Sequence, residues 1–234
     1  LASPYRRGHD DLSRIYGKQW TEWIDRRIAD TPAERDRLLA LGYQVRMCAD
    51  AVDEDGKKTE WLMQRTINQL ENSLKKLLTD PSDRRVIVSG WNVAELDMMA
   101  LPPCHMDYRF VAFENPRVLN LVMTIRSWDL LLGGPANICA TAIFLSIMAR
   151  MAGFEPGVVT IQATNAHIYE DHFDQVRELL TREHFAAPKL ILSDNIKRIE
   201  RLEDVSGAFT RIEPVDITLE GYESHAAIKA PMAA

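Results

Sequence analysis

Residues 138–151 form a stretch that is apolar on almost every side and is closely followed by Gly153. A surface helix carries a single apolar stripe, whereas a helix that is apolar all round is buried. Thr141 and Ser146 interrupt the run, and it is shorter than the roughly 20 residues that cross a membrane. We therefore expect a helix in the core of the fold and no membrane span.

Other segments have the periods of strands and helices. In residues 118–127 apolar and polar side chains alternate, which predicts a strand with one buried face. Short apolar or β-branched runs predict further strands at 86–88, 108–113, 158–163 and 189–192. Helix-like spacing or a helix-start signal predicts helices at 31–40, 61–78 and 173–180.

These elements fit one α+β domain that covers residues 1–234. We expect a mixed or mostly antiparallel sheet that packs on the buried central helix. The most polar stretch, residues 50–59, is expected to be an exposed loop and not a domain boundary.

Charge and cysteine content exclude some classes of protein. The net charge of −6 argues against DNA binding, which requires clustered Lys and Arg. Cys48, Cys104 and Cys139 have no metal-ligand spacing, and the first residues lack the apolar stretch of a signal peptide. We expect a cytoplasmic protein with no metal site, in which Cys48 and Cys139 are small buried side chains.

The motif Leu101-Pro102-Pro103-Cys104-His105 makes Cys104 a candidate nucleophile. Two prolines fix the backbone just before the thiol, and a nucleophilic cysteine requires a rigid, accessible position. A structural cysteine is the alternative, because a neighbouring His in sequence does not have to face the sulfur.

Arginines at two strand ends are candidates for phosphate binding. Arg84 and Arg85 precede one predicted strand, and Arg126-Ser127 ends the alternating strand. A guanidinium group can donate two parallel hydrogen bonds to a phosphate. Ordinary surface charge is the alternative for each of them.

Two further polar motifs allow a structural and a ligand-binding interpretation. Asn137 could cap the central helix, or its amide could match the O4 and N3–H edge of uracil. His167 and Tyr169 share one face of an extended segment. They could hold a sugar hydroxyl or bond only to each other and to the backbone.

Taken in order, these motifs resemble those of the thymidylate synthase family, from about Tyr16 to the C-terminus. They are Tyr16-Gly17-Lys18-Gln19-Trp20, Asp83-Arg84-Arg85, Trp91-Asn92, Glu95-Leu96, Leu101-Pro102-Pro103-Cys104-His105, Arg126-Ser127-x-Asp129, Leu132-Gly133-x-Pro135-x-Asn137, His167-x-Tyr169, and Gly221-Tyr222 with Ile228-Lys229-Ala230-Pro231.

The resemblance implies the thymidylate synthase fold and a one-carbon transfer to C5 of dUMP, in which Cys104 adds to C6. Tyr16 would help to remove the C5 proton, and Asn137 would stabilise charge on O4. The remaining substrate contacts would come from Arg126, Ser127, Trp128, Asp129, His167 and Tyr169, with Arg126 also close to the thiolate.

The resemblance also implies 5,10-methylenetetrahydrofolate as co-substrate. The C-terminal tail would close over it, and the contacts would come from Leu101, Asp129, Leu132, Gly133, Ala136 and Ala233. Two sheet faces would form a homodimer, in which Arg84 and Arg85 reach the partner's phosphate.

Departures from the family pattern lie on the folate side of the site. Ala2 and Tyr5 stand where the family has a Trp-x-x-Trp pair, and Ala136 replaces a Phe. Without this aromatic wall, water rather than hydride should complete the reaction. We therefore favour a deoxyuridylate hydroxymethylase, as in bacteriophages that replace thymine, which yields 5-hydroxymethyl-dUMP. A thymidylate synthase that makes dTMP is the alternative, and an inactive nucleotide-binding homologue is a further one.

The opening segment of the family, with a phosphate-binding Arg loop and a catalytic Glu, has no counterpart before Tyr16. Two interpretations stay open: the segment is lost, or the sequence is a fragment of a longer chain.

Overall fold

The computed structural model describes residues 12–51 and 58–231, and helix α4 (Gly133–Ala152) lies at its centre. The helix starts before the predicted apolar run and ends at Gly153, whose φ of 74° suits a residue without Cβ. Against expectation, α4 has the length and the mean hydropathy, 1.4, of a membrane-spanning helix. It nevertheless packs on the sheet through Leu145 and Met148, as a core helix does.

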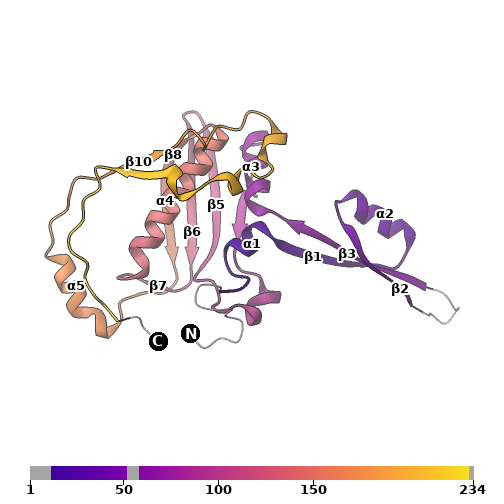
Figure 1. Cartoon of the computed structure of the whole chain (residues 1–234), viewed down its shortest axis with the longest axis horizontal. Coiled ribbons are helices and arrows are strands. Elements are labelled where there is room, and N and C mark those ends of the chain that lie inside the picture. Colours follow the sequence, from indigo (N-terminus) through magenta and orange to yellow (C-terminus); the bar gives the residue numbers. More distant parts are fainter. Residues whose placement is uncertain (1–11, 52–57, 232–234) are drawn as a thin grey trace.

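Four strands form the sheet beside α4, in the order β4-β5-β6-β8 (Figure 1). They are β4 (Ile87–Ser89), β5 (His105–Glu114), β6 (Arg117–Ile125) and β8 (Glu155–Ala163). The first three are antiparallel neighbours, and β8 is parallel to β6 because α4 carries the chain back along the sheet. The mixed sheet on a central helix confirms the predicted fold class.

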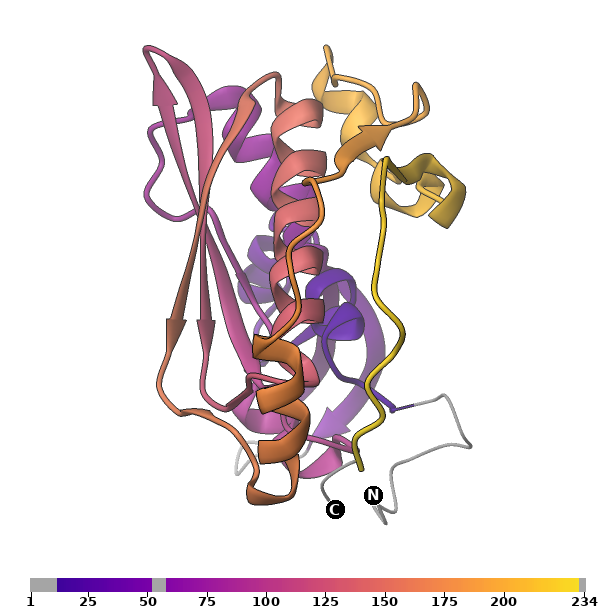
Figure 2. The same ribbon diagram turned by 90° about the vertical axis from the view of Figure 1, so that its left-hand side faces the viewer.

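The alternation in β6 places its apolar side chains against the core. Leu119, Leu121, Met123 and Ile125 are each at most 1% exposed, and they pack with α4 and with α3 (Gln69–Thr79). Figure 2 shows α4 and the C-terminal segments on one side of this sheet. The side chains on its other face, Val111 and Val158 among them, are exposed.

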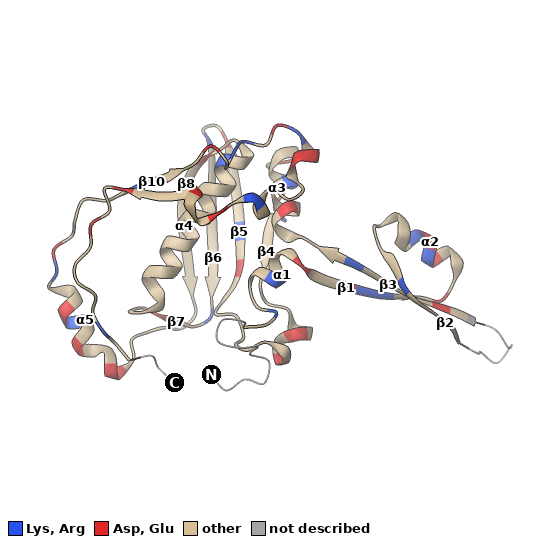
Figure 3. Cartoon of the chain, in the orientation of Figure 1, with Lys and Arg blue, Asp and Glu red and all other residues tan. Residues whose placement is uncertain are grey.

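An arm of three antiparallel strands extends away from this core (Figure 1). Its order is β1-β3-β2, with β1 (Trp23–Ala29), β2 (Gln44–Ala51) and β3 (Lys58–Ile67). Helix α2 (Pro32–Ala40) covers one face, and a small second core lies between them. Figure 3 shows that charged residues are frequent on the arm, whereas α4 carries only Arg150.

The arm corrects the predicted helix at 61–78, which is wrong in its first half. Residues up to Ile67 are the central strand β3, bonded on both edges by β1 and β2. The helix begins after Asn68, whose side chain accepts a hydrogen bond from Glu71 N at 3.1 Å and so caps it. The predicted loop at 50–59 contains the end of β2 and the start of β3. Residues 52–57 between them lie outside the described part of the chain.

The remaining elements are short. They are α1 (Gly17–Thr21), η1 (Val93–Met98), β7 (Trp128–Asp129), β9 (Ala166–His167), η2 (Glu170–His172), α5 (Phe173–Leu180), β10 (Lys189–Leu192), η3 (Leu202–Val205), η4 (Phe209–Arg211), η5 (Pro214–Asp216) and β11 (Ile217–Glu220).

Two cysteines contradict their predicted burial. Cys48 and Cys139 are free and exposed, because one lies on the edge strand β2 of the arm and the other on the outer face of α4. An apolar neighbourhood in sequence therefore does not bury a side chain whose strand or helix face has no cover.

Candidate active site

Cys104 and Arg126 lie next to each other at one end of the sheet, because strand β5 begins beside the end of strand β6. Arg126 N donates to Cys104 O at 2.9 Å. Its guanidinium donates from Nε to Pro103 O and from Nη2 to Pro102 O, each at 3.0 Å. The arginine thus fixes the segment that carries the thiol. Within the described residues, three of its five N–H donors have no acceptor.

Tyr16 holds the same segment from the opposite side. Its Oη accepts a hydrogen bond from Cys104 N at 2.9 Å. Tyr16 has a φ of 35°, a value that non-glycine residues rarely adopt and that is found at functional sites. Burial raises the pKa of the Tyr16 phenol above its usual value, so the phenol keeps its proton at neutral pH.

The His105 ring packs in a cluster of aromatic side chains. Its ring lies edge-on to Tyr16 with centroids 4.1 Å apart, and its Nδ1 is 3.2 Å from Tyr108 Oη. Burial lowers the pKa of His105 to about 4 and raises that of Tyr108 to about 12. The ring is therefore neutral at pH 7.

Asp129 and Asn137 come together around Gly133. Asp129 Oδ1 accepts from Leu131 N at 3.0 Å and from Leu132 N at 3.3 Å, which fixes the turn into α4. A Cβ on Gly133 would lie 3.4 Å from Asn137 Oδ1. Asn137 lies inside the first turns of α4 and Leu132 is the N-cap, so the capping interpretation of Asn137 is wrong.

His167 joins this group through backbone pairing. Strands β7 and β9 are parallel neighbours in which Asp129 is opposite His167, and Leu130 N donates to His167 O at 3.0 Å. The His167 ring packs edge-on against Tyr169 at 5.0 Å, and its Nδ1 is 3.1 Å from Asn165 Oδ1. The predicted ring pair exists, and Tyr169 is partly exposed at its outer side.

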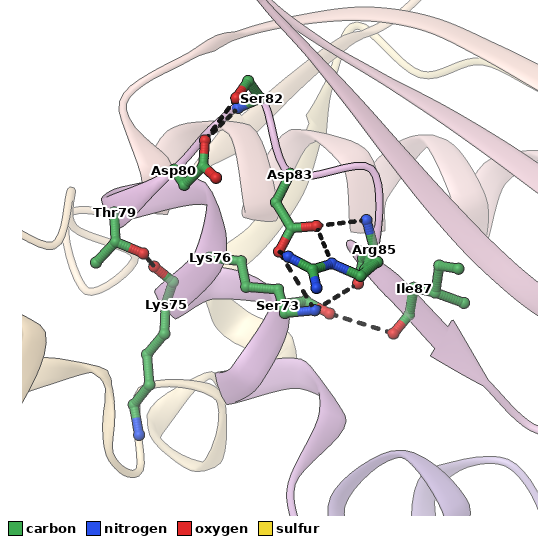
Figure 4. Close-up of polar contacts among 9 residues, drawn as sticks. All are labelled: Ser73, Lys75, Lys76, Thr79, Asp80, Ser82, Asp83, Arg85 and Ile87. Atoms are coloured by element: carbon green, nitrogen blue, oxygen red, sulfur yellow. Dashed lines mark hydrogen bonds and ion pairs between the residues drawn. The ribbon is translucent and has the colours of Figure 1, made fainter.

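Arg84 and Arg85 lie at the other end of the sheet, just before β4. Figure 4 shows the Arg85 guanidinium folded onto Asp83, with Nε 2.8 Å from Oδ1 and Nη2 3.3 Å from Oδ2. Lys76 Nζ donates to Arg85 O at 2.7 Å. Both arginines are exposed. Ile87 pairs with Arg109, so both arginines lie beyond the part of β5 that begins next to Cys104.

The residues predicted to contact folate lie around the start of α4. Leu132, with Leu131 and Pro135, forms one wall of a cavity of about 730 Å³. Residues 179–180, 182–188 and 222–228 form the other walls. Gly133 and the exposed Ala136 lie on the same helix turn, and Leu101 precedes the Cys104 segment. Ala233 lies outside the described residues, as do Ala2 and Tyr5.

A buried polar network holds α1, the helix that follows Tyr16, and the sequence patterns gave it no role. Gln19 is fully buried and donates to Arg14 O at 2.7 Å and to Glu95 Oε2 at 2.6 Å. Its Oε1 accepts from Asn92 Nδ2 at 3.0 Å. Gln19, Asn92 and Glu95 all belong to the motifs quoted above, so the sequence did mark these residues. The spacing of the motifs does not predict, however, which of these side chains contact one another.

Trp91, from the same motif pair as Asn92, supports Arg126. The Arg126 guanidinium carbon lies 5.8 Å from the centre of the Trp91 ring.

No cluster of three His, Cys, Asp or Glu side chains fit for a metal occurs within residues 12–51 and 58–231.

Comparison with known proteins decides the family. A sequence model described as thymidylate synthase matches residues 3–234. The chain belongs to the thymidylate synthase family. This confirms the resemblance and places Cys104, Arg126 and Asn137 in a fold known for members of this family.

Curated family members are identical to the chain at about a third to two fifths of the aligned positions. A thymidylate synthase of Pseudomonas syringae pv. tomato is 39% identical over 234 residues, which is 100% of the chain and 72% of that protein. A probable thymidylate synthase of Escherichia phage T5 is 34% identical over 96% of the chain and 75% of its own length.

The fold has a solved counterpart in the same family. The crystal structure of thymidylate synthase from T4 phage matches with a TM-score of 0.65 and 36% identity. The match covers 72% of this chain and 59% of the phage chain. The chain therefore spans about three fifths of that solved structure.

Proposed function

We propose that the chain is a thymidylate synthase that converts dUMP to dTMP with 5,10-methylenetetrahydrofolate. The observation that carries this proposal is the Cys104 segment, fixed by Arg126 on one side and by Tyr16 on the other. The relatives, including the protein of phage T5, carry the name thymidylate synthase. They therefore favour this function over the hydroxymethylase hypothesis.

Cys104 acts as the nucleophile in the proposed reaction. Uracil C5 is unreactive until Sγ adds to C6, which moves the electron pair of the C5–C6 double bond towards C5 and O4. C5 then bonds to the transferred carbon and loses its proton, while the bonds from that carbon to the two nitrogens of the co-substrate would break. Once that carbon is reduced to a methyl group, Sγ leaves C6 and the double bond forms again.

Two groups handle the charge and the proton. The Asn137 amide can donate to O4 where negative charge develops. Tyr16 keeps its proton at neutral pH, since burial raises its pKa. It therefore orients a water that takes the C5 proton and does not act as a phenolate base.

Arg126 and the His167–Tyr169 pair bind the nucleotide. The three free donors of Arg126 suit a phosphate, with Ser127 beside it. His167 and Tyr169 suit the 3′-hydroxyl. Trp128 precedes Asp129 in β7, next to Ala166 of β9, so we place it at the nucleotide as well.

The residues around Gly133 fit a folate. Gly133 has Asn137 Oδ1 and Asp129 Cβ within 4 Å of where a Cβ would stand, and its neighbours Leu131, Leu132 and Pro135 form an apolar cavity wall. When bound, the co-substrate supplies the one-carbon unit and the hydride, and it leaves as dihydrofolate. Leu101, Leu132, Gly133, Ala136 and Asp129 would hold it, with Ala233 in the tail.

The partly uncovered sheet suggests a homodimer. Exposed apolar side chains on the face opposite α4 include Val111, Phe113 and Val158, and such a surface favours association. Arg84 and Arg85 are exposed at the sheet end remote from Cys104, where only a partner's site can use them.

All three cysteines are free, which suits the reducing cytoplasm.

Hydroxymethylation is the second candidate, because Ala136 stands where the family has a Phe. Release of tritium from C5 of dUMP, followed together with dihydrofolate absorbance, tests the proposal. We expect equal rates of both and no release by Cys104→Ala. Tritium release without dihydrofolate would refute the synthase, and release by Cys104→Ala would refute the covalent route.

A further inference from the structure

His172 closes η2 with none of its surface exposed, although it carries two polar ring nitrogens. Its Nε2 lies 2.7 Å from Pro231 O, in the C-terminal segment. A carbonyl oxygen only accepts, so Nε2 carries the proton. Nδ1 has no partner among the described residues. A buried nitrogen without a hydrogen-bond partner costs free energy, and an apolar side chain would avoid that cost. What a histidine adds at this position is therefore its hydrogen bond to Pro231.

A row of rings connects His172 to the proposed sugar site. The His172 ring lies 5.6 Å from Tyr169 at 74°, and Tyr169 lies 5.0 Å from His167 at 89°. Both are edge-to-face contacts, whose geometry fixes each ring relative to the next. These contacts give a shift of Tyr169 or His167 a direct route to His172.

Among the described residues, the end of the C-terminal segment, residues 229–231, is held most closely by this hydrogen bond to Pro231 O. Its earlier part is held by Arg182, which donates to Ala226 O at 2.7 Å, and by His225, whose Nε2 is 2.9 Å from Glu183 O. Further along, the Gln175 amide lies 3.4 Å from Lys229 O, but with its nitrogen and oxygen exchanged it donates to Asp171 O at 3.2 Å and to His172 O at 3.3 Å. Figures 1 and 2 show the segment running down beside residues 181–188 towards the edge of the sheet that carries the site.

We propose that His172 is a positioning residue that couples the C-terminal segment to the His167–Tyr169 pair. Nucleotide bound at the pair strengthens the docking of the segment, and a docked segment strengthens nucleotide binding by the same factor. The coupling rests on the proposed function, in which the pair holds the sugar of dUMP.

The test uses the whole chain and two variants. His172→Phe keeps a ring in the row but removes the Nε2–H donor, and His172→Gln restores a donor near the same position. Carboxypeptidase release of C-terminal residues, followed by mass spectrometry, reports docking without turnover. Without ligand, His172→Phe should release them faster than wild type. Gln175→Ala is the matched control and should keep the wild-type rate.

Addition of dUMP measures the coupling itself. It should slow release by roughly fivefold or more in wild type, which is the lower end of typical coupling between sites. The slowing should disappear in His172→Phe and return in His172→Gln. Wild-type rates and wild-type slowing in His172→Phe would overturn the proposal. The rates of carboxypeptidase release without ligand test the hydrogen bond between His172 and Pro231, even if dUMP proves not to be the substrate.

Kinetics and a measurement without substitution complete the test. His172→Phe should raise the KM for methylenetetrahydrofolate more than it lowers kcat. Nitrogen NMR of the unsubstituted chain should show the Nε2–H tautomer of His172, with a shift that changes when the chain is shortened after Ala230. An unchanged shift would contradict the bond, whether or not His172→Phe folds.

Discussion

Cys104 is held mainly through its backbone. Its N–H donates to Tyr16 Oη, its carbonyl accepts from Arg126 N, and the two prolines before it accept from the Arg126 guanidinium. The thiol is therefore placed by neighbours that do not need to move when the sulfur forms a bond, which is the geometry that covalent catalysis requires.

Replacement of the sulfur alone should separate chemistry from binding. In Cys104→Ser these backbone bonds can persist, but the hydroxyl is a far weaker nucleophile. We expect kcat to fall roughly 10³-fold or more, while calorimetry shows unchanged dUMP affinity. A variant that keeps a tenth of wild-type turnover would contradict the role of the thiol.

His105 should make stability depend on pH. Burial holds its pKa at about 4 in the folded chain, against 6.5 when unfolded. The unfolded state therefore binds a proton first as pH falls, and stability is lost between pH 6.5 and 4. At pH 5 the loss should be about 2 kcal/mol relative to pH 7. Urea unfolding of wild type and His105→Gln should show this loss in wild type only; equal losses would exclude His105 as the cause.

At the scale of elements, the close contact of β6 with β8 depends on Gly157. A Cβ there would overlap Asn120 Oδ1 and lie 2.5 Å from Val118 Cγ1, beside a shift in strand register. Gly157→Ala should lower the free energy of unfolding by about 1–3 kcal/mol. Gly17→Ala, where nothing lies within 4 Å, is the control. Equal stability of the two variants would contradict this packing.

Elements with a clear period could be predicted from the sequence, and elements defined by partners could not. The alternation at residues 118–127 and the apolar run of α4 reflect burial against one core, so β6 and α4 were found. Residues 61–67 have no such pattern, because β3 is defined by its bonds to β1 and β2. His172 and Gln19 were missed for the same reason: their roles lie in contacts with segments distant in sequence.

At the scale of the whole molecule, the proposed dimer shares its sites. Arg84 and Arg85 cannot reach the Cys104 site of their own chain, so each site should use the pair from the partner. Cys104→Ala chains and Arg84→Ala/Arg85→Ala chains should each be almost inactive. Mixed after subunit exchange, they should recover about a quarter of wild-type activity, from one intact site in each mixed dimer. No recovery, with a dimer present in sedimentation, would contradict the shared site.

The identity of the product tests the central claim most directly. Wild-type chain incubated with dUMP and methylenetetrahydrofolate should yield a nucleotide heavier by one methyl group in place of hydrogen, with an equal amount of dihydrofolate. A nucleotide that carries a hydroxymethyl group, formed without dihydrofolate, would contradict the proposed thymidylate synthase and support the hydroxymethylase instead.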